Sequence, residues 1–119
     1  MDLIVWQEGH KLVIMVYLIT KSFPKEETYS LVDQIRRAVT SITANIAEGF
    51  GRHSFREKIQ FYYIAKGSLE ELRNFLLVAR DIGYIRSEDF QELWDKSVQV
   101  EQLLSKFISK SKSFINHDS

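Results

Sequence analysis

Basic side chains are the residues in this sequence whose type and spacing best fit binding chemistry. Between positions 34 and 66, six basic residues stand against two acidic ones, Glu48 and Glu57. Arginine holds phosphate through two parallel N–H donors, and lysine holds it as a point charge. We therefore take this set as a candidate surface for RNA or DNA, although such charges are also typical of solvated helix faces. The set comprises Arg36, Arg37, Arg52, Arg56, Lys58 and Lys66.

The formal net charge of the whole chain is zero, because other segments offset this basic one. Residues 67–101 carry eight acidic and four basic side chains. A neutral protein can still present a basic face, and charge asymmetry between segments is a hint of polyanion binding.

No group of residues has the pattern of a catalytic or metal site. The chain lacks cysteine, and its histidines do not have the spacing of metal ligands. Glu48 and Glu57 flank His53, but no nucleophile that this histidine could orient lies nearby. Residues 49–51 lack the Lys-Ser/Thr pair of a phosphate-binding loop. We predict a protein that is not an enzyme and has no catalytic residue, metal site or cofactor.

Four stretches carry apolar residues at alternating spacings of three and four, which is the helical signature. They cover about residues 3–22, 28–49, 55–82 and 88–113. The connections between them are short, so neighbouring helices must run antiparallel. The sequence therefore predicts an all-α, antiparallel up-down-up-down four-helix bundle that forms a single domain over residues 1–119.

Local signals mark the ends of these helices. Pro24 ends the first, because the residue before a proline is disfavoured in the α conformation. Ser54 and Glu57 form a capping-box pattern at the start of the third helix, and Gly83 is a typical C-terminal residue. Ser87 is predicted to cap the fourth.

Two polar or small clusters fall inside helices and are interpreted first as packing devices. Asn45 lies on the apolar line of the second helix, where a buried amide needs hydrogen-bond partners. Gly67 and Ser68 lie in the middle of the third helix, where glycine is unfavourable. A close approach of that helix to Ala44 and Ala47 would explain the small residues.

The hydrophobic pattern bears on membranes and on assembly. The longest apolar run, residues 12–19, is shorter than the roughly 20 residues that a membrane-spanning helix needs. The start of the chain has no signal-peptide pattern, and the lack of cysteine is compatible with a reducing cytosol. We predict a protein that does not enter a membrane. Large apolar residues such as Phe75 and Trp94 lie beside the main apolar lines, which predicts a second buried face and self-association.

Several segments together resemble a known family. They are Phe-Pro-Lys-Glu-Glu at 23–27, Gln-Ile-Arg-Arg-Ala at 34–38, Asn-Ile-Ala-Glu-Gly at 45–49 with Arg52, and Ile-Ala-Lys-Gly-Ser-Leu-Glu-Glu-Leu at 64–72. In order and spacing they resemble the four-helix-bundle proteins encoded in 23S rRNA intervening sequences. The resemblance extends from about Trp6 to about Phe107.

This resemblance implies a bacterial cytoplasmic protein that assembles as a ring, commonly a homopentamer. A related protein is the accessory subunit of diversity-generating retroelements, which binds nucleic acid and a reverse transcriptase. By this resemblance Arg36, Arg37, Arg52 and Lys66 are the candidate basic surface. Structural or interface roles fall to Asn45, Glu48, Gly67 and Ser68.

Three hypotheses follow. The first is a non-enzymatic homo-oligomer that binds structured RNA or DNA, with Arg36 and Arg37 exposed on one face. The second is a scaffold that docks a protein partner, such as a nucleic-acid enzyme, through an apolar or acidic surface. The third is an enzyme that uses His53 and Glu48, which a histidine far from any pocket would exclude.

Overall fold

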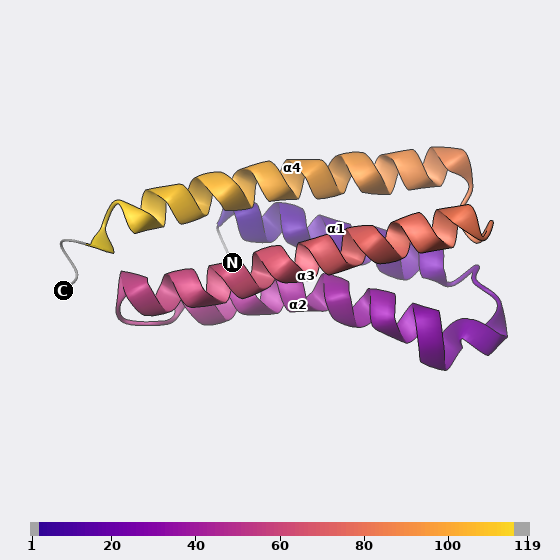
Figure 1. Cartoon of the computed structure of the whole chain (residues 1–119), viewed down its shortest axis with the longest axis horizontal. Helices are drawn as coiled ribbons and strands as arrows, with labels where there is room; N and C mark the ends of the chain where they lie inside the picture. The colour runs from indigo at the N-terminus through magenta and orange to yellow at the C-terminus, as the bar shows by residue number, and fades with distance from the viewer. Residues whose placement is uncertain (1–2, 116–119) are drawn as a thin grey trace.

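The computed structural model describes residues 3–115, which form a bundle of four long α-helices (Figure 1). The helices are α1 (Ile4–Thr20), α2 (Asp33–Phe50), α3 (Phe55–Asp81) and α4 (Ser87–Lys112). Each packs against the next, and α1 also packs against α4, which closes the bundle. The described residues include no strand. The predicted all-α, antiparallel four-helix bundle is thereby confirmed.

The bundle is a rod whose three dimensions are 50, 25 and 22 Å. Its up-down path brings the α2–α3 turn, the start of α1 and the end of α4 to one end of the rod (Figure 1). The α1–α2 connection and the α3–α4 turn lie at the other end. No helix in residues 3–115 combines the length and the apolar character that crossing a membrane requires.

Two helix ends form as their residues predict. The Ser54 hydroxyl accepts the backbone N–H of Glu57 at 3.2 Å, which satisfies a donor of the first turn of α3. Gly83 has a φ of +83° after the end of α3, and the N–H of Tyr84 donates to the carbonyl of Ala79 at 2.9 Å. This is a Schellman ending, in which a left-handed residue returns the chain onto the last turn.

Other ends differ from the prediction. The N-cap of α4 is Arg86, and the expected cap, Ser87, is already the first helical residue. The first helix stops at Thr20, and Phe23 beyond it is buried in the core. The next stretch is a 3₁₀ turn at Lys25–Glu27 and a π-helical turn at Thr28–Val32, which lead into α2. These irregular turns reverse the chain between α1 and α2.

One core runs the length of the rod. The Tyr62 ring is only 1% exposed and lies 4.8 Å, centroid to centroid, from the ring of Phe107. Burial raises the pKa of the Tyr62 hydroxyl to about 12, so this side chain is a neutral part of the core. Fully buried side chains come from all four helices and include Leu12, Val16, Ile35, Ile42, Ile46, Leu69, Leu72, Leu76, Val100 and Leu104.

The polar residues that the sequence singled out meet between α2 and α3. The Asn45 amide donates to the Ser41 carbonyl at 2.8 Å and to its hydroxyl oxygen at 3.0 Å. The Ser68 hydroxyl lies 2.8 Å from the Ser41 hydroxyl, so Ser41 joins the two helices. Asn45 is half-buried, and its amide N–H groups find their acceptors within this network.

Close helix approach occurs at Gly49 and not at Gly67. A Cβ atom on Gly49 would lie 2.7 Å from a Tyr62 ring carbon and 2.9 Å from the Lys58 carbonyl oxygen. A Cβ on Gly67 would meet nothing within 4 Å, because Gly67 faces away from the core. The predicted packing of Gly67 against Ala44 is therefore wrong within the chain. The side of the helix on which a residue lies, and not its small size, decides whether a larger side chain there would clash with a neighbouring helix.

Glu8 on α1 ties that helix to α4 through charge. Its carboxylate pairs with Lys11 at 2.8 Å and with Lys96 of α4. The hydrogen bonds from Lys11 and then from Lys96 lower the pKa of Glu8 from 4.5 to about 2. A carboxyl whose pKa is lower in the folded state stabilises the fold above its unfolded pKa, and loses that contribution as pH falls through the folded pKa.

We therefore expect Glu8→Gln to lower the free energy of unfolding above about pH 4.5, with the difference from wild type vanishing as pH falls to about 2. Urea unfolding at a series of pH values measures this difference. Glu71→Gln is the matched control, because the Glu71 side chain is exposed in the middle of α3 and lies in no ion pair within residues 3–115. A difference from wild type that did not change with pH would contradict the assignment.

Candidate nucleic-acid interface

The six basic residues from the sequence do not form one cluster. Arg36 and Arg37 lie in the first turn of α2, whereas Arg52, Arg56 and Lys58 surround the α2–α3 turn. The rise of an α-helix is about 1.5 Å per residue, so about 20 Å of α2 separates the two groups. Lys66 lies about two turns along α3 from Lys58. A single ligand contact over the whole set would have to follow most of the length of α2.

Arg36 uses its donors inside the chain. Its Nε donates to the Thr20 hydroxyl oxygen at 3.0 Å, and its Nη2 donates to the Tyr17 carbonyl at 3.4 Å. The guanidinium carbon also lies 4.5 Å from the centre of the Tyr17 ring. Arg37 points to solvent and pairs with Asp33 at 3.1 Å. The expectation that Arg36 and Arg37 share an exposed face is thus wrong, because successive helical residues point about 100° apart.

Arg52 and Arg56 extend from the α2–α3 turn. Arg52 pairs with Glu48 at 3.1 Å and lies 4.6 Å from the centre of the Phe61 ring. Glu48 therefore holds Arg52, and it makes no pair with the exposed His53, which removes the support for a catalytic pair there. Arg56 is exposed and makes no ion pair or hydrogen bond within the described residues. Its charge is available to a ligand.

Lys58 lies over aromatic rings at the same turn. Its ammonium donates to the Phe50 carbonyl at 2.7 Å and lies 5.4 Å from the Phe50 ring centre and 5.7 Å from that of Phe55. Phe55 in turn stacks on Phe114 beyond α4, at 5.0 Å. These rings and the Lys110 side chain border a pocket of about 220 Å³. Lysines and aromatic rings thus share one pocket.

The end of α4 adds lysines that the sequence analysis did not include in the candidate surface. Lys110 borders the pocket with Lys58, and Lys106 borders an adjoining groove with Lys110. The Lys112 ammonium lies 5.0 Å from the Tyr63 ring centre, in a hollow that Lys66 also lines. The predicted up-down topology could have indicated these lysines, because it places the end of the fourth helix beside the turn between the second and third.

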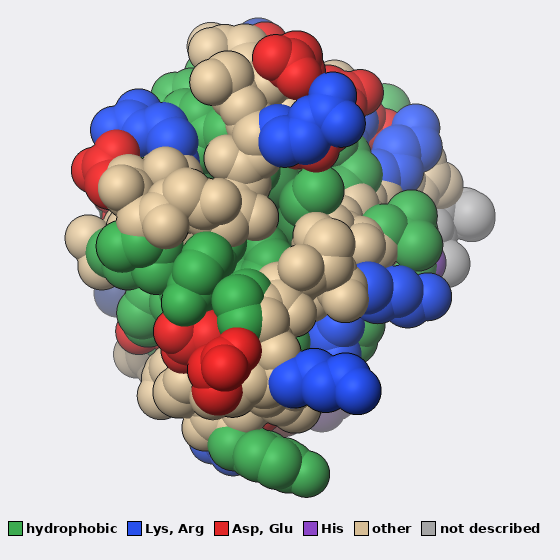
Figure 2. Space-filling model, turned by 90° about the vertical axis from the view of Figure 1, so that its right-hand side faces the viewer, with side chains coloured by type: hydrophobic (Ala, Val, Ile, Leu, Met, Phe, Trp, Pro, Cys, Tyr) green, Lys and Arg blue, Asp and Glu red, His purple; other side chains and the backbone are tan. Residues whose placement is uncertain are grey.

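We call the resulting surface the basic end. Only Glu48, already paired, and Glu57 carry negative charge beside it in the α2–α3 region. The dipoles of antiparallel helices largely cancel, so side-chain charge dominates the local field. The opposite end of the rod is different, because Lys/Arg and Asp/Glu side chains lie interspersed there (Figure 2). The basic end consists of Arg52, Arg56, Lys58, Lys106, Lys110 and Lys112.

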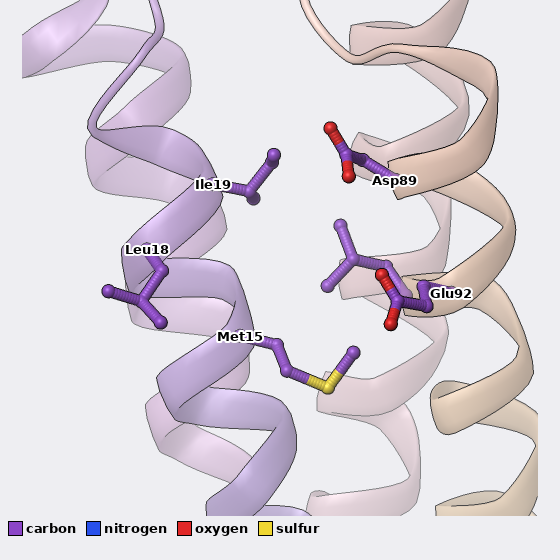
Figure 3. Close-up of a pocket in the computed structure, with 6 residues that line it drawn as sticks. Met15, Leu18, Ile19, Asp89 and Glu92 are labelled. Carbon is purple, nitrogen blue, oxygen red and sulfur yellow. The ribbon is translucent and has the colours of Figure 1, made fainter.

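A groove between α1 and α4 is unsuited to phosphate. Met15 and Ile19 of α1 point across it toward α4, whereas Leu18 points away (Figure 3). Asp89 and Glu92 of α4 line its other side, and neither makes an ion pair or hydrogen bond within residues 3–115. Unpaired carboxylates repel a polyanion, so this groove is excluded as a nucleic-acid site. The described residues also contain no cluster of acidic or histidine side chains that could hold a metal ion.

Comparison with known proteins identifies the family. The family described as 23S rRNA-intervening sequence protein matches residues 1–106. The chain belongs to this family. Asn45, Glu48, Gly67 and Ser68 lie within the matched part, whereas Lys110, Lys112 and Phe114 lie beyond it. The basic end therefore combines residues inside the family match with residues beyond it.

A solved structure has the same fold. It is described as a protein with unknown function from the S23 ribosomal protein family, from Bacteroides thetaiotaomicron. Its TM-score to this chain is 0.80 at 24% sequence identity, and the similarity covers 88% of this chain and 98% of that one. Comparison with curated proteins gave no match. Neither description names an enzymatic activity.

Proposed function

We propose that this protein is a non-enzymatic homo-oligomer that binds structured RNA or DNA through its basic end. The observation that carries the proposal is the convergence of lysines and arginines from the α2–α3 turn and from α4 around exposed aromatic rings. Neutralisation of phosphates by such side chains releases counterions, which supplies most of non-specific affinity for nucleic acid.

Fluorescence anisotropy tests the proposal with a labelled RNA hairpin and a DNA duplex of equal length. Each is titrated with the intact protein at about 50 and about 200 mM salt, because six phosphate contacts would cost roughly a thousandfold in affinity over that range. We expect micromolar or tighter binding at the lower salt concentration and a steep loss at the higher one. Absence of binding at the lower concentration would overturn the proposal.

Self-association is the second part of the proposal, and it rests on two exposed apolar faces. On α1, Ile4 and Leu18 are 64% and 60% exposed. Ile64 of α3 and Ile82, which caps the end of α3, are each 51% exposed. The two helices lie diagonally in the bundle, so these are different faces. Contact between unlike faces of successive copies is heterologous and closes into a ring when the rotation permits, and the family resemblance favours a pentamer.

We expect Leu18→Glu to lower the molecular mass in solution from an oligomer toward a monomer. A carboxylate buried in an apolar contact loses its hydration without a partner, whereas on a free surface it costs little. Light scattering after size-exclusion chromatography measures the mass, and circular dichroism checks that the helices remain.

Tyr29→Glu is the control for this substitution, because Tyr29 is 95% exposed and lies in the connection before α2. A wild-type protein that is monomeric at high concentration would contradict self-association. A mass that Leu18→Glu leaves unchanged would show that this face of α1 is not in the contact, and an equal fall in both variants would show that the effect is not specific to α1.

The acidic groove between α1 and α4 supports a second candidate function, a scaffold that docks a protein partner such as a nucleic-acid enzyme. Its apolar floor and its unpaired Asp89 and Glu92 fit a basic partner surface. An oligomer that failed to bind RNA or DNA at low salt would favour this second function over the first.

A further inference from the structure

We propose that the pocket at the basic end binds an unpaired base of a nucleic-acid strand. This inference rests on the proposed function and adds the class of ligand that the site selects. The pocket lies between the α2–α3 turn and the end of α4, and Phe50, Phe55 and Phe114 line it together with Lys58 and Lys110.

The exposed aromatic rings are the first argument. Phe50 and Phe114 are 48% and 39% exposed, although both border the pocket. Phe114 stacks on Phe55 with one face, at 5.0 Å and an interplanar angle of 30°. A base is a flat apolar surface that stacks on such rings irrespective of its identity. The pocket, at about 220 Å³, has room for a single planar base.

The placement of charge is the second argument. The lysines stand beside the rings, with the Lys58 ammonium within 6 Å of two ring centres. A strand whose base lies on the rings carries its phosphates along the same edge, where Lys58, Lys110 and the free Arg56 can neutralise them. Aromatic platforms bordered by cations are the arrangement that proteins use for single strands.

The scarcity of directional groups is the third argument. Besides the lysines, two side chains with polar groups line the pocket. The Ser111 hydroxyl already donates to the Phe107 carbonyl at 2.8 Å, and the Tyr62 side chain is only 1% exposed. Recognition of one particular base needs several such groups. The pocket therefore selects the unpaired state of a base and not its identity. Bases inside a duplex have their faces covered by their neighbours and cannot enter.

The test compares the affinity for a single-stranded oligonucleotide with that for a duplex of equal length, by anisotropy at about 50 mM salt. For the wild type we expect tighter binding of the single strand by about tenfold or more. In Phe114→Leu, and separately in Phe50→Leu, we expect this ratio to fall toward one while the affinity for the duplex stays unchanged. Leucine keeps the apolar contact and removes the stacking face.

Tyr29→Leu is the matched control, because it removes an exposed ring that is not part of the pocket. Circular dichroism verifies that the variants fold. If Phe114→Leu proves unstable, Phe50→Leu by itself still tests the pocket. Equal wild-type affinity for both ligands, or a ratio unaffected by either phenylalanine variant, overturns this inference while the proposed function stands. Failure of both ligands to bind at low salt overturns the two together.

Discussion

Replacement of Lys58 and Lys110 together by glutamate is expected to weaken binding of an RNA hairpin by about a hundredfold at 50 mM salt. The two side chains border one pocket from α3 and α4, so their reversal puts negative charge on both sides of the ligand. Each lost phosphate contact also lowers the slope of log affinity against log salt by about 0.9. Anisotropy titrations over a series of salt concentrations measure both quantities.

Lys21→Glu with Lys25→Glu is the matched control, because it changes the net charge equally at the opposite end of the rod. We expect it to alter the affinity less than about threefold, since exposed charges beyond a Debye length of about 14 Å at 50 mM salt are screened. Arg36→Ala with Arg37→Ala tests the alternative site at the start of α2. Equal losses in the two charge reversals would show that only net charge matters, and would remove the basic end as the site.

Gly49→Ala is expected to lower the free energy of unfolding by about 1–3 kcal/mol, although alanine is the better helix former. The added methyl group would lie 2.7 Å from a Tyr62 ring carbon and 2.9 Å from both the Lys58 carbonyl oxygen and the Phe61 Cβ. Backbone and ring must both move to admit it, and Tyr62 is part of the packed core. Urea unfolding measures the change.

Gly67→Ala is the control with the opposite sign. Its methyl group would meet nothing within 4 Å, so we expect stabilisation by up to about 1 kcal/mol from helix propensity alone. The mass in solution is measured alongside, because Gly67 is exposed and a neighbouring copy could cover it. Destabilisation of the subunit by both substitutions would contradict the packing described here.

The pairing of the notable polar residues shows where sequence reasoning was sufficient. Asn45 on an apolar line required hydrogen-bond partners, and it found them in Ser41, which also meets Ser68. The need of Asn45 for hydrogen-bond partners follows from its own helix. That Ser41 also meets Ser68 depends on how α2 is aligned with α3. Gly67 lies two residues before the buried Leu69, so helical periodicity places it on the opposite, exposed side of α3, where a small residue does not indicate close packing.

The sequence by itself determined the helices, most of their ends and their antiparallel order, because apolar periodicity, capping and short connections act over a few residues. Only the tertiary structure decided which charges act together. Arg36 contacts Tyr17 and Thr20 of α1, whereas Lys110 of α4 lines the same pocket as Lys58 of α3. Side chains distant in sequence meet only when helices pack in one register, and no local pattern contains that register.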